Sequence, residues 1–232
     1  MIARTSMMIV LAVAVFLTVF PVAVSPAEAQ VLFSTKFNGT ENPLSEGGVW
    51  LNLQGPTKVQ KLSGIALGTQ DGTNGYDDSY AYLRREQTAA GTGAWPANLR
   101  LTAIISRPVS VTEGPHEVEL HHRVTESNYA GSARLYEVSL GFGGDITIVR
   151  WDGAIGFFVQ LAQNLNGPVP QDGDEFSSTM VGCDITASLN GTVLLTASDC
   201  SYTYGSPGIG FFRREGGQTT DLGLKSFSVS RP

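Results

Sequence analysis

Basic residues, histidines and cysteines are scarce in this chain. Its 232 residues include 15 Lys and Arg against 21 Asp and Glu, only three His and two Cys, and the formal net charge is −6. The shortage of Lys and Arg disfavours nucleic acid and anionic membrane surfaces as partners, because both attract basic patches. We therefore expect no nucleic acid partner, and predict a ligand that is neutral, cationic or bound by stacking.

Long apolar runs are also missing, apart from one at the N-terminus. Residues 7–24 follow Arg4 and precede the small-x-small pattern Ala27-Glu28-Ala29. This arrangement is typical of a secretory signal peptide, and the small residues favour cleavage over retention as a membrane anchor. We predict a signal peptide over residues 1–29 and one domain over residues 30–232. That domain is expected to be secreted, outside the cell or in the cell envelope, without membrane insertion.

The two cysteines, Cys183 and Cys200, flank a predicted hairpin whose arms bring its ends together. A disulfide fits this placement and an exported protein. Closing a loop of this size stabilises a fold by about 3 kcal/mol in the chain-entropy model. The alternative, a catalytic thiol, needs a histidine base and protection from oxidation.

Helical periodicity is rare, and the 27 glycines interrupt what there is. Short apolar segments instead recur between Gly, Asn, Asp and Pro, which indicates an all-β sandwich or barrel. The predicted strands are 31–37, 65–67, 79–83, 99–105, 117–124, 135–142, 146–150, 157–161, 176–181, 185–189, 193–197, 209–212 and 222–229.

The last third of the chain carries the most specific pattern. An alternating strand ends at Asn190-Gly191, a strong hairpin signal, and a second apolar strand leads on to Gly205-Ser206-Pro207-Gly208-Ile209-Gly210-Phe211-Phe212. This succession resembles the concanavalin A-like lectin/glucanase superfamily, which includes laminin-G-like domains. The resemblance implies a two-sheet antiparallel jelly-roll sandwich. It also implies that residues 32–34 pair with residues 227–229 in one sheet.

The segment His116 to Val124 contains the best candidates for catalysis. Because side chains alternate along a strand, Glu117, Glu119, His121 and Arg123 are predicted to share one face, opposite Val118, Leu120 and Val124. Carboxylates on such a face can serve glycoside hydrolysis. The alternative is a solvent-facing ladder of paired charges.

The same face resembles the Glu-x-Asp-x-Glu strand of the glucanases in that superfamily. The resemblance implies that Glu117 is the nucleophile and Glu119 the middle carboxylate. This chain departs from the pattern at His121, which stands where the glucanases have the acid/base Glu. A histidine cannot be assumed to protonate a glycosidic oxygen there.

A polar, glycine-rich segment offers oxygen ligands for a metal. Asp71, Asn74 and Asp77 are spaced by glycines and could surround one calcium ion. The alternative is an ordinary turn loop. No second His or Cys stands at the usual zinc spacing, so no zinc site is predicted, and calcium is the one cofactor considered.

Sugar binding without catalysis needs aromatic faces and a few polar groups. Besides Arg123, the predicted ligand-binding residues lie in the loop near Tyr76 and in the motif around Trp151; they are Tyr76, Asp77, Asp78, Arg150, Trp151 and Asp152. The alternative for Trp151 is a place in the core.

The leading hypothesis is thus a secreted carbohydrate-binding or adhesion domain without catalysis, whose partner is a polysaccharide or another glycan. A second hypothesis is a glycoside hydrolase or polysaccharide lyase that uses Glu117 as base or nucleophile and His121 as proton donor. A third is a structural protein of the envelope or extracellular matrix.

Overall fold

The computed structural model describes residues 29–53, 57–70, 77–84, 95–108, 116–126, 132–154, 157–213 and 222–232. Residues 1–28 of the predicted signal peptide lie outside these ranges, as do Asp71, Asn74 and Tyr76. Within the ranges, the chain contains no helix long and apolar enough to cross a membrane.

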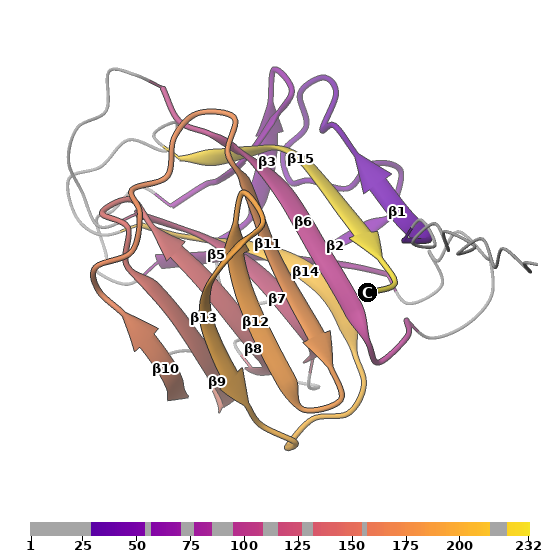
Figure 1. Cartoon of the computed structure of the whole chain (residues 1–232). Coiled ribbons are helices and arrows are strands. Elements are labelled where there is room, and N and C mark those ends of the chain that lie inside the picture. The colour runs from indigo at the N-terminus through magenta and orange to yellow at the C-terminus, as the bar shows by residue number, and fades with distance from the viewer. Residues whose placement is uncertain are drawn as a thin grey trace, which may run out of the picture.

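The described strands form two antiparallel sheets that pack face to face (Figure 1). Sheet A contains β1 (Val31–Thr35), β3 (Val59–Leu62), β4 (Ile65–Gly68), β6 (Leu99–Ser106), β11 (Glu175–Val181), β12 (Asp184–Leu189), β13 (Thr192–Ser198) and β15 (Gly223–Ser230). Sheet B contains β2 (Trp50–Asn52), β5 (Asp77–Leu83), β7 (His116–Glu126), β8 (Ser132–Gly141), β9 (Ile146–Ala154), β10 (Phe158–Asn164) and β14 (Ser206–Arg213).

The strand order places β7 at the centre of sheet B. Sheet A runs β13-β12-β11-β6-β15-β4-β3, with β1 also paired to β15, and sheet B runs β10-β9-β8-β7-β14-β5-β2. The predicted all-β class and two-sheet jelly-roll architecture are confirmed.

The main core lies between the sheets. Val118 and Leu120 of β7 point into it and are fully buried, as are Leu101 of β6 and Phe176 of β11. These apolar side chains alternate with residues on the outer face of each strand, which is why two amphipathic sheets pack together. His122 also points inward, where its Nε2 lies 2.8 Å from Ser178 Oγ, so this histidine is a buried core residue with a hydrogen-bond partner.

Three sequence predictions about pairing are confirmed. Strands β12 and β13 form a hairpin through Asn190-Gly191, and Cys183 is disulfide-bonded to Cys200. Strand β1 pairs with β15, with Phe33 opposite Val229 and Ser34 opposite Ser228. The first and last described strands therefore lie side by side (Figure 1).

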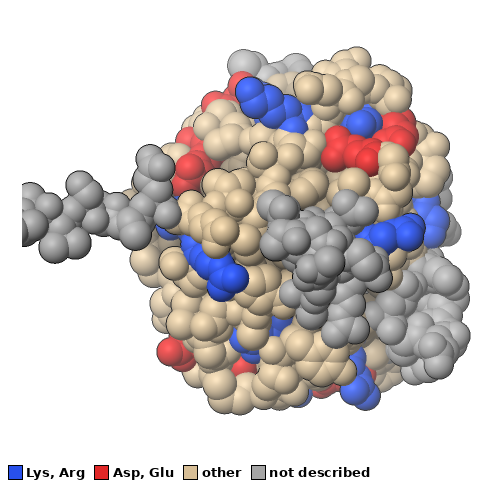
Figure 2. Space-filling view, turned by 90° about the vertical axis from the view of Figure 1, so that its right-hand side faces the viewer, with Lys and Arg blue, Asp and Glu red and all other residues tan. Residues whose placement is uncertain are grey.

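Charged residues on the face shown in Figure 2 are dispersed. Lys and Arg lie in small separate groups, with Asp and Glu near several of them and uncharged residues between. The expectation that nucleic acid is not a partner stays a prediction.

Candidate functional site at the centre of sheet B

Strand β7 places Glu117, Glu119 and His121 on the outer face of sheet B, the side that is turned away from sheet A. Their inward-pointing neighbours Val118 and Leu120 belong to the main core, so the predicted alternation holds along this part of the strand. Glu119 and His121 are each only 1% exposed. The alternative of a solvent-facing ladder of Glu117, Glu119 and Arg123 is therefore wrong for Glu119.

Glu119 and His121 are hydrogen-bonded, with 2.9 Å between Glu119 Oε2 and His121 Nε2. Gly210 of β14 lies opposite Glu119 in the sheet and leaves the space that both side chains occupy. A Cβ on Gly210 would lie 2.1 Å from Glu119 Oε2 and 2.7 Å from His121 Nε2. The Gly-x-Pro-Gly-Ile-Gly motif, which the sequence offered only as a sign of the fold, thus makes room for the polar side chains.

A second carboxylate, that of Glu137 on β8, completes this group. Its Oε2 accepts hydrogen bonds from Tyr80 Oη at 3.0 Å and from Trp151 Nε1 at 2.8 Å. The ring of Tyr80 packs edge-on against that of His121, with centroids 4.6 Å apart. We call Tyr80, Glu119, His121, Glu137 and Trp151 the polar cluster; each of these residues is at most 7% exposed.

The polar cluster contains a possible set of metal ligands. One ligand atom each from Glu119, His121 and Glu137 lies within 4.8 Å of the others. Sequence analysis missed Glu137, because it lies on a neighbouring strand and no motif links it to β7. Of the predicted calcium ligands, Asp71 and Asn74 lie outside the described residues, and the side chain of Asp77 is not described.

Burial shifts the protonation of this face. It raises the pKa of Glu117 to about 7, and the nearby charge of Glu137 adds to the rise. It also raises the pKa of Glu137 to about 7 and that of Glu119 well above the usual range. The pKa of His121 is lowered to about 3, again by burial. A neutral imidazole with so low a pKa is a poor general acid, which argues against His121 as the proton donor.

Arg123 does not share this face, and that prediction is wrong. Arg123 has a positive φ of 56°, and the pairing of β7 with β8 shifts register between His122 and Thr125. Such a bulge reverses the alternation of the residues beyond it. Val124 consequently joins the outer-face cluster with Tyr80 and Trp151, opposite to its predicted side.

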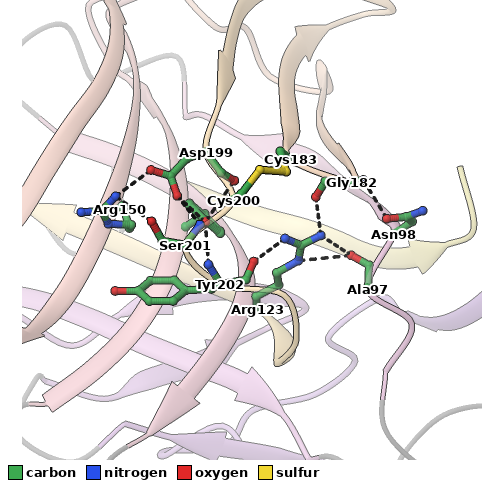
Figure 3. Close-up of a disulfide and its surroundings, with 11 residues drawn as sticks. Ala97, Asn98, Arg123, Arg150, Gly182, Cys183, Asp199, Cys200, Ser201 and Tyr202 are labelled. Atoms are coloured by element: carbon green, nitrogen blue, oxygen red, sulfur yellow. Dashed lines mark hydrogen bonds and ion pairs between the residues drawn. A yellow bond between two sulfur atoms is a disulfide. The ribbon is translucent and has the colours of Figure 1, made fainter.

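The guanidinium of Arg123 instead binds backbone carbonyl groups near the disulfide (Figure 3). It donates to the carbonyl oxygens of Ala97, Gly182 and Tyr202, with Nη2 at 3.0 Å from the first and 2.7 Å from the second. These bonds occupy the group that the sequence analysis assigned to a ligand.

Arg150 and Asp152 lie on the other side of β9 from Trp151, because neighbouring residues alternate. Arg150 Nε lies 2.8 Å from Asp152 Oδ1. Its Nη1 lies 2.6 Å from Asp199 Oδ2, a contact that Figure 3 shows. Tyr202 Oη donates to Asp152 Oδ1 at 2.5 Å. This network holds the segment around Cys200 against sheet B, so the motif around Trp151 does not present its three residues to one ligand.

Aromatic rings cross the outer face of sheet B from its centre to its edge. From Tyr80 the row continues to Trp151, at a centroid distance of 5.9 Å, and then to Phe158 of β10, at 5.5 Å. Trp151 is only 6% exposed, whereas Phe158 is 51% and the preceding Phe157 72% exposed. Asp78, another predicted ligand-binding residue, is 8% exposed. Sequence analysis placed a strand here and missed these two surface aromatics, although adjacent Phe residues at a strand start were a usable signal.

The described part of the molecule also has a small cavity and a surface groove that could receive a ligand. A cavity of about 20 Å³, room for roughly one water molecule, lies beside Glu117, His116 and Arg213. A groove of about 450 Å³ lies on sheet A along β1 and β15. Its lining residues are Ser34, Thr35, Lys36, Asn38, Ser226, Phe227 and Ser228.

The solved structures that resemble this chain decide the fold type. A carbohydrate-binding module, CBM66 from Bacillus subtilis, matches with a TM-score of 0.51 and 13% identity over 81% of this chain and 96% of its own. The chain has the concanavalin A-like jelly-roll fold. A laminarinase from Rhodothermus marinus matches this fold with a TM-score of 0.56 and 11% identity, over 88% and 98% of the two chains.

The fold also occurs in a β-glucanase from Bacillus licheniformis, which matches with a TM-score of 0.52 and 11% identity, over 87% of this chain and 98% of its own. No protein-family model matches the sequence, and no curated protein matches it either. At these identities the comparison establishes the shared fold.

Proposed function

We propose that this protein is a secreted glycan-binding or adhesion module without catalytic activity. Its ligand is a polysaccharide or another glycan that stacks on Phe157 and Phe158 at the β10 edge of sheet B. The observation that carries the proposal is the exposure of these two rings, 72% and 51%, beside the buried Trp151. Sugar rings present apolar faces that pack on aromatic side chains in this way.

The burial of Glu119 and His121 and the small space beside Glu117 support binding over catalysis. Glu119 and His121 are 1% exposed and bonded to each other, and the cavity beside Glu117 has room for about one water molecule. A glycosidic bond has to come within hydrogen-bond distance of its catalytic acid. The similar structures bear names of both kinds, a carbohydrate-binding module and carbohydrate-degrading enzymes, and so are compatible with either role.

The first test is binding of residues 30–232 to an array of plant, algal and bacterial polysaccharides. Phe158→Ala is expected to weaken binding roughly tenfold, which corresponds to about 1.4 kcal/mol of lost stacking. Leu62→Ala removes a 42% exposed apolar side chain from β3, at the opposite end of the sandwich, and serves as the matched control. The proposal fails if no glycan binds, or if Lys36→Ala in the sheet A groove abolishes binding while Phe158→Ala does not.

A second candidate, a glycoside hydrolase or polysaccharide lyase, is favoured by one observation. The pKa of Glu117 is raised to about 7 by burial and by Glu137, as suits a carboxyl group that exchanges protons near neutral pH. This candidate predicts release of reducing or unsaturated ends from one of the polysaccharides. Glu117→Gln would then abolish release while retention of the protein on the polysaccharide persists.

A further inference from the structure

We infer that Glu119, His121 and Glu137 form a binding site for a divalent first-row transition metal ion, of the kind that zinc and manganese represent. The site would join β7 to β8 at the centre of sheet B. It is independent of glycan binding at the β10 edge.

The donor atoms have suitable chemistry and spacing. Two carboxylates and an imidazole are ligands that zinc accepts, at bond lengths of about 2.0–2.2 Å. Ligand atoms of a tetrahedral site with such bonds lie roughly 3.3 Å apart. Here the three candidate atoms lie within 4.8 Å of one another, and Glu119 Oε2 lies 2.9 Å from His121 Nε2.

One oxygen in this group has no partner. Glu119 Oε1 is buried and accepts no hydrogen bond from any residue in the described part of the chain. Leaving a buried carboxylate oxygen unpaired is costly. The hydrogen bond to His121 involves Oε2 and leaves Oε1 unpaired. A cation between Glu119 and Glu137 would bind Oε1 and so remove this cost.

The two carboxylates of the group, Glu119 and Glu137, also favour binding of a cation. Within the described ranges, the side chain that bonds Glu119 is the neutral imidazole of His121, and neither Glu119 nor Glu137 forms an ion pair with a Lys or Arg. Two buried carboxylates without a basic partner repel each other. One divalent ion compensates both.

The surroundings of the group match those of known metal sites. Glu137 Oε2 accepts hydrogen bonds from Tyr80 Oη and Trp151 Nε1, and such outer donors orient the carboxylates that bind a metal. Gly210 leaves the space beside Glu119 that a methyl group would fill. Because each residue is at most 7% exposed, we infer a closed site that stabilises the sheet.

The direct test measures metal in the full mature protein, purified without chelator, by plasma mass spectrometry and equilibrium dialysis against Zn²⁺, Mn²⁺ and Ca²⁺. One Zn²⁺ or Mn²⁺ per chain is expected, with Ca²⁺ bound more weakly. Zinc at about 100 times its Kd is expected to raise the Tm of the chelator-treated protein by roughly 5–10 °C. Substoichiometric binding of both transition metals, or preference for Ca²⁺, overturns the inference.

Variants locate the ion. Glu119→Gln and Glu137→Gln are expected to remove the zinc-dependent rise in Tm, whereas Glu175→Gln, a half-exposed carboxylate on sheet A, keeps it. Tyr80→Phe deletes only the hydroxyl that bonds Glu137 and is expected to weaken zinc binding about 10- to 100-fold.

If the Gln variants do not fold, the visible absorption of Co²⁺ in the native protein reports whether nitrogen and oxygen atoms bind it. Unchanged zinc affinity in Tyr80→Phe and a spectrum of free aqueous Co²⁺ both contradict the site.

Discussion

Gly210 shows how a missing side chain shapes this face at the scale of one residue. A Cβ at this position would clash with the carboxylate of Glu119 and the ring of His121, which are hydrogen-bonded to each other. Gly210→Ala is therefore expected to lower the free energy of unfolding by about 1–3 kcal/mol through overpacking. Urea unfolding measures this loss.

Gly143→Ala is the control for that substitution. A Cβ at Gly143 would meet Asp145 at an ordinary 3.6 Å, so a loss below about 0.5 kcal/mol is expected. Equal losses in the two variants would contradict the role given to Gly210.

Single residues also mark how far the sequence leads to the candidate site. Alternation along β7 correctly placed Glu117, Glu119 and His121 on one face, because that rule needs only the strand. Glu137 could not be found in this way, since it meets His121 through the register of β7 and β8. The contact of Trp151 with Phe158 likewise joins two strands, β9 and β10, and could not be found from one strand alone.

The bulge in β7 is the feature of an element that the sequence conceals. Arg123 adopts a positive φ, which glycine or asparagine would have signalled and arginine does not. The longer strands were predictable from their alternation, whereas β2 and β3 have only three and four residues and show none. The pairing of β1 with β15 came from the resemblance to a known fold and that of β12 with β13 from the Asn190-Gly191 turn, whereas the other pairings were not predicted.

Arg123 stabilises this bulge by tying three chain segments together. Arg123→Ala leaves the carbonyl groups of Ala97, Gly182 and Tyr202 without their donor, so a loss of about 2–3 kcal/mol in unfolding free energy is expected. Thermal and urea unfolding measure it. Arg134→Ala, an exposed arginine on β8, should change the stability by less than about 0.5 kcal/mol. A similarly small effect of Arg123→Ala would show that the bulge does not need these bonds.

At the scale of the whole molecule, Asp199 links the two sheets at one end of the sandwich. It follows β13 of sheet A and contacts Tyr136 and Arg150 of sheet B, at 2.6 Å each. Burial raises the pKa of Asp199, but hydrogen bonds from Tyr136 and Ser201 outweigh it and hold the pKa at about 2.

This lowered pKa predicts acid sensitivity. The folded value lies below the ordinary 3.8, so the stabilisation is complete above pH 4 and is lost as the pH falls from about 4 to 2. We expect a loss of roughly 1–2 kcal/mol over this interval, after allowance for solvent screening. Unfolding curves of the native protein and of Asp199→Asn at several pH values test this. The variant should be less stable at pH 6 and should lose less between pH 4 and 2; parallel curves would contradict the assignment.

The pairing of β1 with β15 brings the two ends of the sandwich close together, which suits the domain to circular permutation. Arg231 N donates to Gln30 O at 3.0 Å, so in a protein shortened to residues 30–232 a linker of a few residues can join Pro232 to Gln30 without distorting either sheet. New ends could be placed at the exposed Asn190-Gly191 turn, because the Cys183–Cys200 disulfide encloses that turn and keeps β12 and β13 covalently connected. A circular permutant of this design is expected to fold into the same sandwich, and the same geometry would let the domain be inserted into a surface loop of another protein.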